Sequence, residues 1–282
     1  MTTNIVVAAI QMCSGPEVEN NLSQAEVLMR KAAEAGADWV VLPENFAALD
    51  APRDVLAQAA PGIVEWLSSQ ARRWGMGVVG GSVALPDRPD GAPVSHDRFR
   101  SACLVMDSQG ALIARYDKVH LFDAQVADGR GGYRESALYE PGDGPVTVRH
   151  RGWRLQPIIC YDLRFPEILR QDRTPPDWVA VPAAFTAVTG ARHWSLLVRT
   201  RAVENQCYVV AANQGGRHPS GRETWGHSMI AGPDGEVLAE QVVASEEGAV
   251  VLSRLARAHL HAVREAMPVA VHRRYGMLAA DQ

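Results

Sequence analysis

Short apolar runs that alternate with helical patterns constrain the fold of this chain more than any other feature. Five runs read as buried strands, at 4–12, 39–42, 78–85, 153–160 and 178–182. Apolar residues recur at helical spacing over 20–36, 61–74, 191–206 and about 255–266. A chain in which such strands and helices alternate folds into sheets that are covered by helices.

Hairpin signals interrupt this alternation. The turn Ser108-Gln109-Gly110 joins strand patterns at 101–107 and 112–116, and Pro233-Asp234-Gly235 follows a strand pattern at 227–231. Further strand patterns lie at 207–212, 237–239 and 248–252. Because hairpins require antiparallel neighbours, we expect an α/β fold with mixed sheets and not a pure doubly wound parallel sheet. The sequence contains no internal repeat or linker, which predicts a single domain over residues 1–282.

Composition excludes several classes of protein. Apolar residues make up 47% of the 282 residues and charged residues 21%, which is typical of a globular protein and not of a disordered one. The net charge of −4 is modest and there is no basic stripe, so we expect no nucleic-acid partner. The chain has no apolar run of membrane-spanning length and no basic start of a signal peptide. We therefore expect a cytoplasmic protein with no membrane partner.

Cysteine, histidine and glycine patterns do not indicate a metal or a nucleotide cofactor. The four cysteines are widely spaced, at Cys13, Cys103, Cys160 and Cys207. They lack Cys-x-x-Cys spacing and are too few for a disulfide scaffold, and the histidines lack the spacing of metal ligands. The pattern Gly75–Gly80 fits G-x-G-x-x-G, but it follows a predicted helix and enters a strand, which is the wrong context for a dinucleotide site.

Lysine is rare in this chain. Only Lys31 and Lys118 occur among 28 basic residues. Arginine keeps its charge permanently, whereas lysine is a compact cation whose pKa can move. Lys31 falls near the end of the first predicted helix, where a cation suits the helix dipole. Lys118 follows the predicted hairpin and has apolar neighbours, which favours a chemical role, although a surface position is the usual fate of a lysine.

Cys160 and Glu44 each follow a buried apolar strand. A new helix can begin at Pro166, and a thiol that faces the N-terminus of a helix is expected to have a lowered pKa. The alternative for Cys160 is a small buried residue without chemistry. Glu44 follows Pro43 at a strand end and is expected to be partly desolvated, as suits a general base. The alternative for Glu44 is a solvated loop carboxylate.

A carboxylate, an ammonium and a thiol at three strand ends form a chemically complete set. The carboxylate takes the proton of the thiol, the thiolate attacks a carbonyl carbon, and the ammonium stabilises the oxyanion. The backbone N–H of Tyr161 is a natural second donor to that oxyanion. The set therefore indicates nucleophilic attack on a carbonyl compound.

Three ordered motifs resemble those of the nitrilase superfamily of carbon–nitrogen hydrolases. They are Leu42-Pro43-Glu44-Asn45, Tyr116-Asp117-Lys118-Val119-His120-Leu121-Phe122-Asp123 and Cys160-Tyr161-Asp162-Leu163-Arg164-Phe165-Pro166-Glu167. The similarity continues through 182–186, 193–194, 199–206 and 226–229 and covers nearly the whole chain. Within the superfamily, the chain looks most like the amidase branch that includes deaminated glutathione amidase and omega-amidase.

This resemblance implies a four-layer α-β-β-α sandwich and a catalytic triad. It makes Glu44 the base, Lys118 the oxyanion stabiliser and Cys160 the nucleophile. Glu135 matches a second glutamate that the family places in the loop after the lysine, within the long loop 123–144. The resemblance implies no metal and no organic cofactor. It also implies a homodimer or a higher homo-oligomer. The sequence itself offers an apolar segment, Met267–Val271, from which we expect the C-terminal helix and tail at about 255–282 to lie at an interface.

Several residues near the triad motifs are expected to contact a small-molecule substrate. We expect such contacts from Tyr161, Arg164, Phe185 and Thr186. The loop arginines Arg130, Arg134 and Arg164 suggest that the substrate carries a carboxylate. The alternative for Arg130 and Arg134 is a solvated loop, and the alternative for Arg164 is an ion pair with Asp162 or Glu167.

The predicted activity is hydrolysis of a small, carboxylate-bearing amide, similar to deaminated glutathione, through a cysteine thioester. The products are an acid and an amine or ammonia. Omega-amidase activity on substrates like 2-oxoglutaramate, nitrilase activity and N-carbamoyl hydrolysis use the same triad and stay open as alternatives. A further alternative is an inactive binding or scaffold protein that has kept the fold.

Overall fold

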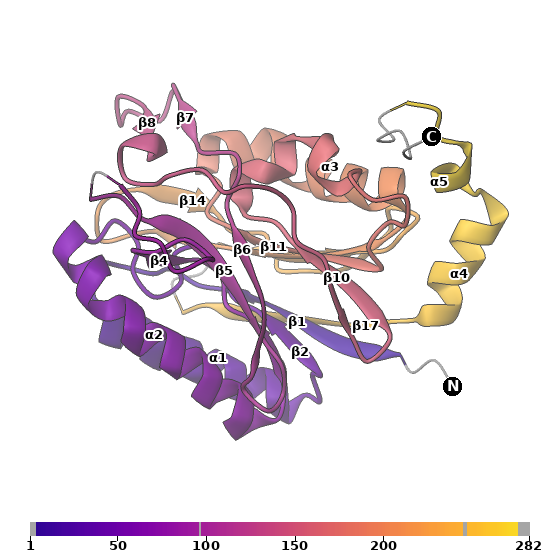
Figure 1. Ribbon diagram of the computed structural model, residues 1–282, viewed down its shortest axis with the longest axis horizontal. Helices are drawn as coiled ribbons and strands as arrows, with labels where there is room; N and C mark the ends of the chain where they lie inside the picture. The colour runs from indigo at the N-terminus through magenta and orange to yellow at the C-terminus, as the bar shows by residue number, and fades with distance from the viewer. Residues whose placement is uncertain (1–3, 96, 245–246, 276–282) are drawn as a thin grey trace.

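The computed structural model describes residues 4–95, 97–244 and 247–275 (Figure 1). Two β-sheets lie face to face in the middle of the molecule. Helices α1 (Val18–Glu34) and α2 (Arg53–Trp74) cover the outer face of the first sheet, and α3 (Ala187–Asn205) covers the second. This arrangement confirms the predicted four-layer α-β-β-α sandwich. Helices α4 (Arg257–Ala266) and α5 (Val269–His272) extend along one side, and residues 276–282 of the predicted tail lie outside the described residues.

The first sheet is mixed and has the strand order β17-β1-β2-β3-β5-β4, with β6 paired to β5. Its strands are β1 (Ile5–Gln11), β2 (Trp39–Val41), β3 (Gly77–Val79), β4 (Val83–Leu85), β5 (Arg100–Met106), β6 (Leu112–Asp117) and β17 (Ala249–Leu255). The pairs β1–β2 and β2–β3 are parallel, and the other pairs are antiparallel. The predicted hairpin around Ser108-Gln109-Gly110 is the β5–β6 pair.

The second sheet is also mixed and has the order β16-β15-β12-β11-β10-β9. Its strands are β9 (Val148–His150), β10 (Trp153–Pro157), β11 (Trp178–Ala183), β12 (Tyr208–Asn213), β15 (Met229–Ala231) and β16 (Val237–Glu240). The central strands β10, β11 and β12 are parallel. Two short hairpins lie outside the sheets, β7 (Asp123–Ala124) with β8 (Tyr133–Arg134) and β13 (Gly215–Arg217) with β14 (Glu223–Trp225).

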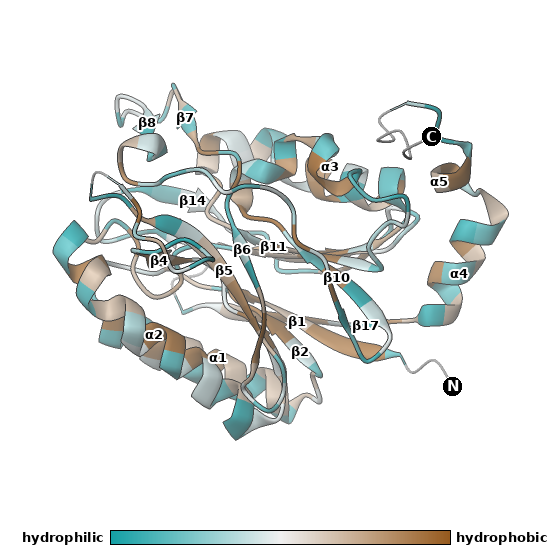
Figure 2. Ribbon diagram, viewed as in Figure 1, coloured by the Kyte–Doolittle hydropathy of each residue, from teal (hydrophilic) through white to brown (hydrophobic). Residues whose placement is uncertain are grey.

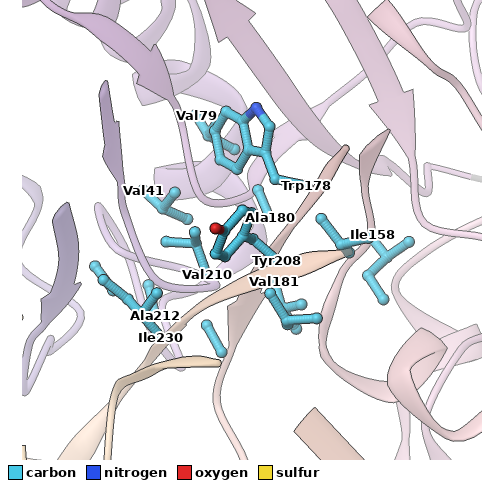
Figure 3. Packing of buried hydrophobic residues seen from close by; sticks show 14 of the residues in the cluster. Val41, Val79, Ile158, Trp178, Ala180, Val181, Tyr208, Val210, Ala212 and Ile230 are labelled. Carbon is cyan, nitrogen blue, oxygen red and sulfur yellow. The ribbon is translucent and has the colours of Figure 1, made fainter. Parts of the chain in front are cut away.

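The core between the two sheets combines small and β-branched side chains with large aromatic ones, among them Trp178 and Tyr208. Val41 and Val79 of the first sheet lie beside Ala180 and Val210 of the second (Figure 3). Every residue of β11 and β12 is buried, because both faces of these strands are covered. Figure 2 shows hydrophobic residues along the strands, whereas the helices carry both hydrophobic and hydrophilic residues. This packing explains why the strand patterns were continuous apolar runs and not alternating ones.

Two predicted element boundaries are wrong for local reasons. The predicted strand at 78–85 is two strands, because Gly81 has a φ of +58° and turns the chain between β3 and β4. Helix α2 begins at Arg53 and not at Pro61. Pro61 and Ala57, the residue four positions earlier, are both exposed, so water can bond the carbonyl that proline leaves unpaired. Leu56 and Ile63 keep the buried face of the helix continuous across the proline.

The described part of the chain contains no helix that is both long and apolar enough to span a membrane. Within the same residues, histidine, cysteine, aspartate and glutamate side chains do not gather in groups of three or more that could hold a metal ion. The pattern Gly75–Gly80 begins where α2 ends and contains β3, so Gly75 ends the helix, Gly77 lies in the strand and Gly80 follows it.

We predict that Gly81→Ala destabilises the protein more than Gly75→Ala. Both glycines have left-handed backbones, with φ values of +58° and +63°. A Cβ on Gly81 would lie 2.2 Å from the carbonyl oxygen of Pro43, whereas a Cβ on Gly75 would meet nothing within 4 Å. We expect Gly75→Ala to cost about 1 kcal/mol of unfolding free energy and Gly81→Ala about 2 kcal/mol more. Denaturant unfolding measures the difference, and equal losses would contradict it.

Candidate active site

Glu44 follows β2 at the end of the first sheet, and its backbone is held from both sides. The buried Gln214 donates from Nε2 to the carbonyl oxygen of Glu44 at 3.0 Å. The N–H of Asn45 donates to Oγ of Ser82 at 2.8 Å. These bonds use only the backbone atoms of Glu44 and Asn45. Both oxygens of the buried Glu44 carboxylate are therefore left for other partners.

Lys118 directly follows β6, and its side chain is only 1% exposed. Its backbone N–H donates to the carbonyl oxygen of Ser101 at 2.9 Å, and its carbonyl oxygen accepts from Gly142 at 2.8 Å. The ammonium Nζ donates to Oε1 of Glu44 at 2.7 Å and to both carboxylate oxygens of Glu135 at 2.8 and 2.9 Å. The lysine that the sequence singles out therefore lies between two carboxylates.

Glu135 comes from the long loop that was predicted to carry function. It is the first residue of a short 3-10 helix, η1 (Glu135–Ala137), and follows β8 directly. One of its carboxylate oxygens also accepts the backbone N–H of Phe122. This bond ties the loop to the segment that follows Lys118 and fixes the carboxylate against the ammonium.

Cys160 lies three residues beyond the end of β10 and begins the 3-10 helix η2 (Cys160–Arg164). Its φ of +46° is in the left-handed region, which residues other than glycine seldom adopt and which stores strain. Cys160 lines a cavity of about 230 Å³ together with Glu44, Lys118 and Glu135. The charges of Glu44 and Lys118 act on the thiol in opposite directions, Glu44 raising its pKa and Lys118 lowering it. The structure thus brings the four predicted catalytic residues together in one cavity.

The charge state of Cys160 differs from the expectation. Burial raises the pKa of the Cys160 thiol well above its usual value, and Glu44 adds to this rise, while Lys118 opposes it. The predicted lowering of the pKa by a helix N-terminus is therefore wrong. The helix predicted to begin at Pro166 is a 3-10 helix of only four residues, η3 (Pro166–Leu169), and it follows the five-residue η2. Burial beside a carboxylate outweighs the dipoles of such short helices. The resting thiol is protonated and needs a base.

Lys118 and Glu135 shift each other's pKa. Burial lowers the pKa of Lys118, but Glu135 and Glu44 outweigh it and raise this pKa well above its usual value. Burial raises the pKa of Glu135, and Lys118 opposes that rise. The ammonium therefore stays charged at neutral pH, as an oxyanion stabiliser must.

The four residues predicted to contact substrate, Tyr161, Arg164, Phe185 and Thr186, all line the same cavity. The guanidinium of Arg164 lies 5.1 Å from the ring centroid of Phe185 and 3.1 Å from Nδ1 of His193. Among the described residues, Arg164 forms no ion pair with Asp162 or Glu167. The alternative interpretation of Arg164 as the partner of one of these carboxylates is therefore wrong. Thr186 caps the N-terminus of α3 and accepts a hydrogen bond from the N–H of Thr189.

The loop arginines separate into two groups. Both Arg130 and Arg134 are exposed, but only Arg134 lines the cavity, whereas Arg130 lies 3.8 Å from Asp50 in an ion pair. Arg222 also lines the cavity and was not predicted. It comes from the turn between β13 and β14, donates to the carbonyl oxygen of Ala184 at 3.0 Å and has no motif around it. Only the tertiary fold brings it to the site.

Comparison with known families decides the classification. The model of the carbon–nitrogen hydrolase family matches residues 6–265. This chain belongs to the carbon–nitrogen hydrolase family. It is an amidase-type hydrolase of the nitrilase superfamily, as the ordered motifs predicted.

Similar proteins cover nearly the whole chain. A deaminated glutathione amidase of Yersinia enterocolitica is 38% identical over 277 residues, which is 96% of this chain and 94% of that protein. An omega-amidase of Xenopus tropicalis is 31% identical over 98% of this chain and 97% of that protein. The crystal structure of Saccharomyces cerevisiae Nit3, a member of branch 10 of the nitrilase superfamily, is 28% identical and superimposes with a TM-score of 0.80 over 94% of this chain and 95% of that chain.

We predict that Lys118→Arg lowers kcat by about 100-fold, the size expected when an oxyanion donor is lost. The charge is kept, but the larger planar guanidinium does not match the positions at which a compact ammonium bonds both Glu44 and Glu135. The matched control is Lys31→Arg, because Lys31 is exposed in the last turn of α1. Steady-state kinetics on an amide substrate measures both variants. Full activity of Lys118→Arg would refute the geometric requirement.

Proposed function

We propose that this carbon–nitrogen hydrolase cleaves a small, carboxylate-bearing amide with Cys160 as nucleophile, Glu44 as general base and Lys118 as oxyanion stabiliser. The contact that carries the proposal is the 2.7 Å bond between Lys118 Nζ and Glu44 in the cavity that also holds Cys160. It supports a site in which the base, the electrophilic donor and the nucleophile act on one carbonyl group.

Acylation begins with a proton transfer from the Cys160 thiol to the Glu44 carboxylate. The thiolate sulfur then bonds the amide carbon, and the carbonyl oxygen becomes an oxyanion. Lys118 has three N–H donors and two carboxylate partners, so one donor can turn to this oxyanion. The backbone N–H of Tyr161 supplies a second donor. When the C–N bond breaks, Glu44 gives its proton to the leaving nitrogen and a thioester remains.

Deacylation uses the same carboxylate a second time. Glu44 takes a proton from water, and the hydroxide adds to the thioester carbon. The C–S bond breaks, the acid leaves, and Glu44 returns the proton to the Cys160 sulfur. Glu135 stays bonded to Lys118 throughout and keeps the ammonium charged and oriented. The cycle is balanced without a metal or an organic cofactor.

The substrate class follows from the charges that line the cavity. Arg134, Arg164 and Arg222 are among the residues that line it, and Arg222 is paired there with Asp50 at 3.5 Å. Such groups suit a carboxylate on the substrate, because arginine binds carboxylates with two parallel hydrogen bonds. The similarity to deaminated glutathione amidases supports a substrate of that kind. The relative named as an omega-amidase keeps 2-oxoglutaramate as the second candidate.

We also propose that the protein works in the cytoplasm as a homodimer or higher homo-oligomer. The oligomer is supported by the exposed apolar surface near the C-terminus, where Met267 is 63% and Val271 77% exposed. Apolar side chains of this size that stay in contact with water favour burial against a second copy.

We predict that amides with a carboxylate are hydrolysed with a kcat/KM at least about 10-fold above that of uncharged aliphatic amides, because one carboxylate–arginine contact contributes about this much. The panel contains deaminated glutathione, 2-oxoglutaramate, aliphatic amides, nitriles and carbamoyl amino acids. Cys160→Ala is expected to abolish turnover. Cys207→Ala, which removes a buried thiol outside the cavity, is expected to keep it.

Product analysis distinguishes the alternatives. An acid with ammonia or amine supports amide hydrolysis, whereas carbon dioxide with amine indicates an N-carbamoyl hydrolase. A protein that hydrolyses nothing in the panel and is not modified at Cys160 by a thiol-directed reagent would instead be a binding or scaffold protein.

A further inference from the structure

A buried carboxylate with no assigned role lies two residues after the nucleophile. Asp162 has a fully buried side chain, at 0% exposure. Its Oδ2 accepts the hydroxyl of Tyr116 at 2.6 Å and the backbone N–H of Ile159 at 2.9 Å. Its Oδ1 accepts the backbone N–H of His120 at 2.9 Å and lies 2.8 Å from Nδ1 of the same residue. Each carboxylate oxygen therefore has two hydrogen-bond partners.

Burial of this charge demands that the hydrogen bonds be kept. A carboxylate removed from water is costly unless its acceptor positions are filled. The four partners of Asp162 fill these positions and approach from fixed backbone and ring positions. A ring stack between His120 and Phe165, with centroids 3.8 Å apart, restrains the imidazole further. The carboxylate and its donors hence have little freedom to shift separately.

These partners come from the two segments that carry the catalytic groups. Tyr116 and His120 lie on either side of Lys118, at the end of a strand of the first sheet. Ile159 immediately precedes Cys160, beyond a strand of the second sheet. The Tyr116 hydroxyl also accepts the N–H of Val119 at 3.3 Å, so it is bound into the turn after the lysine. Asp162 thus joins the lysine turn to the cysteine turn.

We propose that Asp162 is a positioning residue that sets the separation between the Lys118 ammonium and the Cys160 sulfur, with Tyr116 and His120 as its partners. The inference rests on the proposed roles of Lys118 and Cys160. It assigns Asp162 no contact with substrate. Its action is to hold the cysteine turn, including the left-handed backbone of Cys160, against the lysine turn.

This positioning has an electrostatic consequence. Lys118 opposes the rise in the pKa of Cys160, and this effect weakens as the distance between the two groups grows. Burial, with Asp162, raises the pKa of Tyr116 well above its usual value, so Tyr116 remains a donor at all working pH values. Loss of the Tyr116 hydroxyl should therefore loosen the lysine turn and raise the pKa of Cys160 further.

The test compares Tyr116→Phe with Tyr208→Phe. Both tyrosines are buried, and each hydroxyl donates one hydrogen bond and accepts one. Tyr208 bonds the backbone of Ala256 and does not line the cavity, so it is a matched control for the loss of a buried hydroxyl. We measure kcat, KM and thermal unfolding for each variant. We also measure thiolate absorbance against pH, with Cys160→Ala as the blank.

Tyr116→Phe is expected to lower kcat by roughly 10-fold with KM unchanged, because a displaced Lys118 stabilises the transition state less well while substrate binding is kept. Its thiolate should form at higher pH than in the wild type. Tyr208→Phe should lose similar thermal stability without either change. Asp162→Asn should act in the same direction as Tyr116→Phe and more strongly, because its amide N–H groups oppose donors.

Equal kcat values for the two tyrosine variants, measured below their unfolding temperatures, would overturn the proposal. An unshifted thiolate titration in Tyr116→Phe would do the same. If Asp162→Asn does not fold, the tyrosine pair still decides the question. Failure of the proposed function is distinguishable, because it would appear as turnover in Cys160→Ala, whereas failure of this inference leaves Cys160→Ala inactive.

Discussion

The contact between the Lys118 ammonium and two buried carboxylates is the interaction on which this site depends. Burial of one charge is costly, and Glu44 and Glu135 offset that cost only at bonding distances of 2.7 to 2.9 Å. Removal of Lys118 would leave two buried carboxylates without a cation, whereas removal of either carboxylate would leave one ion pair. The cluster has two negative charges and one positive charge. It therefore disfavours a further anion, and the thiol of Cys160 stays protonated until Glu44 accepts its proton.

The architecture supplies the rigidity that this cluster needs. Glu44 follows β2, which runs parallel to its neighbour β1 in the first sheet, and Cys160 follows β10, which runs parallel to its neighbour β11 in the second. Lys118 follows β6, the second strand of a hairpin in the first sheet. The sheets are packed through a core of buried apolar side chains, which does not yield to small shifts (Figure 3). Buried polar side chains, among them Gln214 and Asp162, then join the turns across the gap between the sheets. The strands bring Glu44, Lys118 and Cys160 close together, and these hydrogen bonds fix the distances between their side chains.

Much of the fold was predictable from the sequence because its signals are local. Apolar runs gave the buried strands, the turn at Ser108-Gln109-Gly110 gave a hairpin, and three motifs gave the residues of the site. Boundaries failed where one residue acts against the pattern around it. Pro61 lies inside α2 because both it and the carbonyl it leaves unpaired face water, and Gly81 breaks a strand because it turns the chain.

The site was less predictable where it depends on distant contacts. Arg222 lines the cavity from a hairpin that no motif marks, and Gln214 supports Glu44 across 170 positions of the chain. The sequence around Cys160 predicts a lowered pKa, because it shows only the helix that follows the thiol. Burial and the Glu44 carboxylate come from the tertiary structure, and they reverse the direction. Motifs therefore indicated which groups react, but not their protonation states.

The central claim is that Cys160 is a neutral thiol activated by Glu44, and the thiolate titration of the wild type and Glu44→Gln tests it most directly. Thiolate absorbance against pH, with Cys160→Ala as the blank, should show a wild-type thiol that ionises only at alkaline pH. Glu44→Gln should ionise at lower pH, because it removes a negative neighbour and leaves Lys118, while its turnover falls by about 100-fold through loss of the base. A wild-type thiolate already formed at neutral pH, or an unshifted titration in Glu44→Gln, would contradict the account.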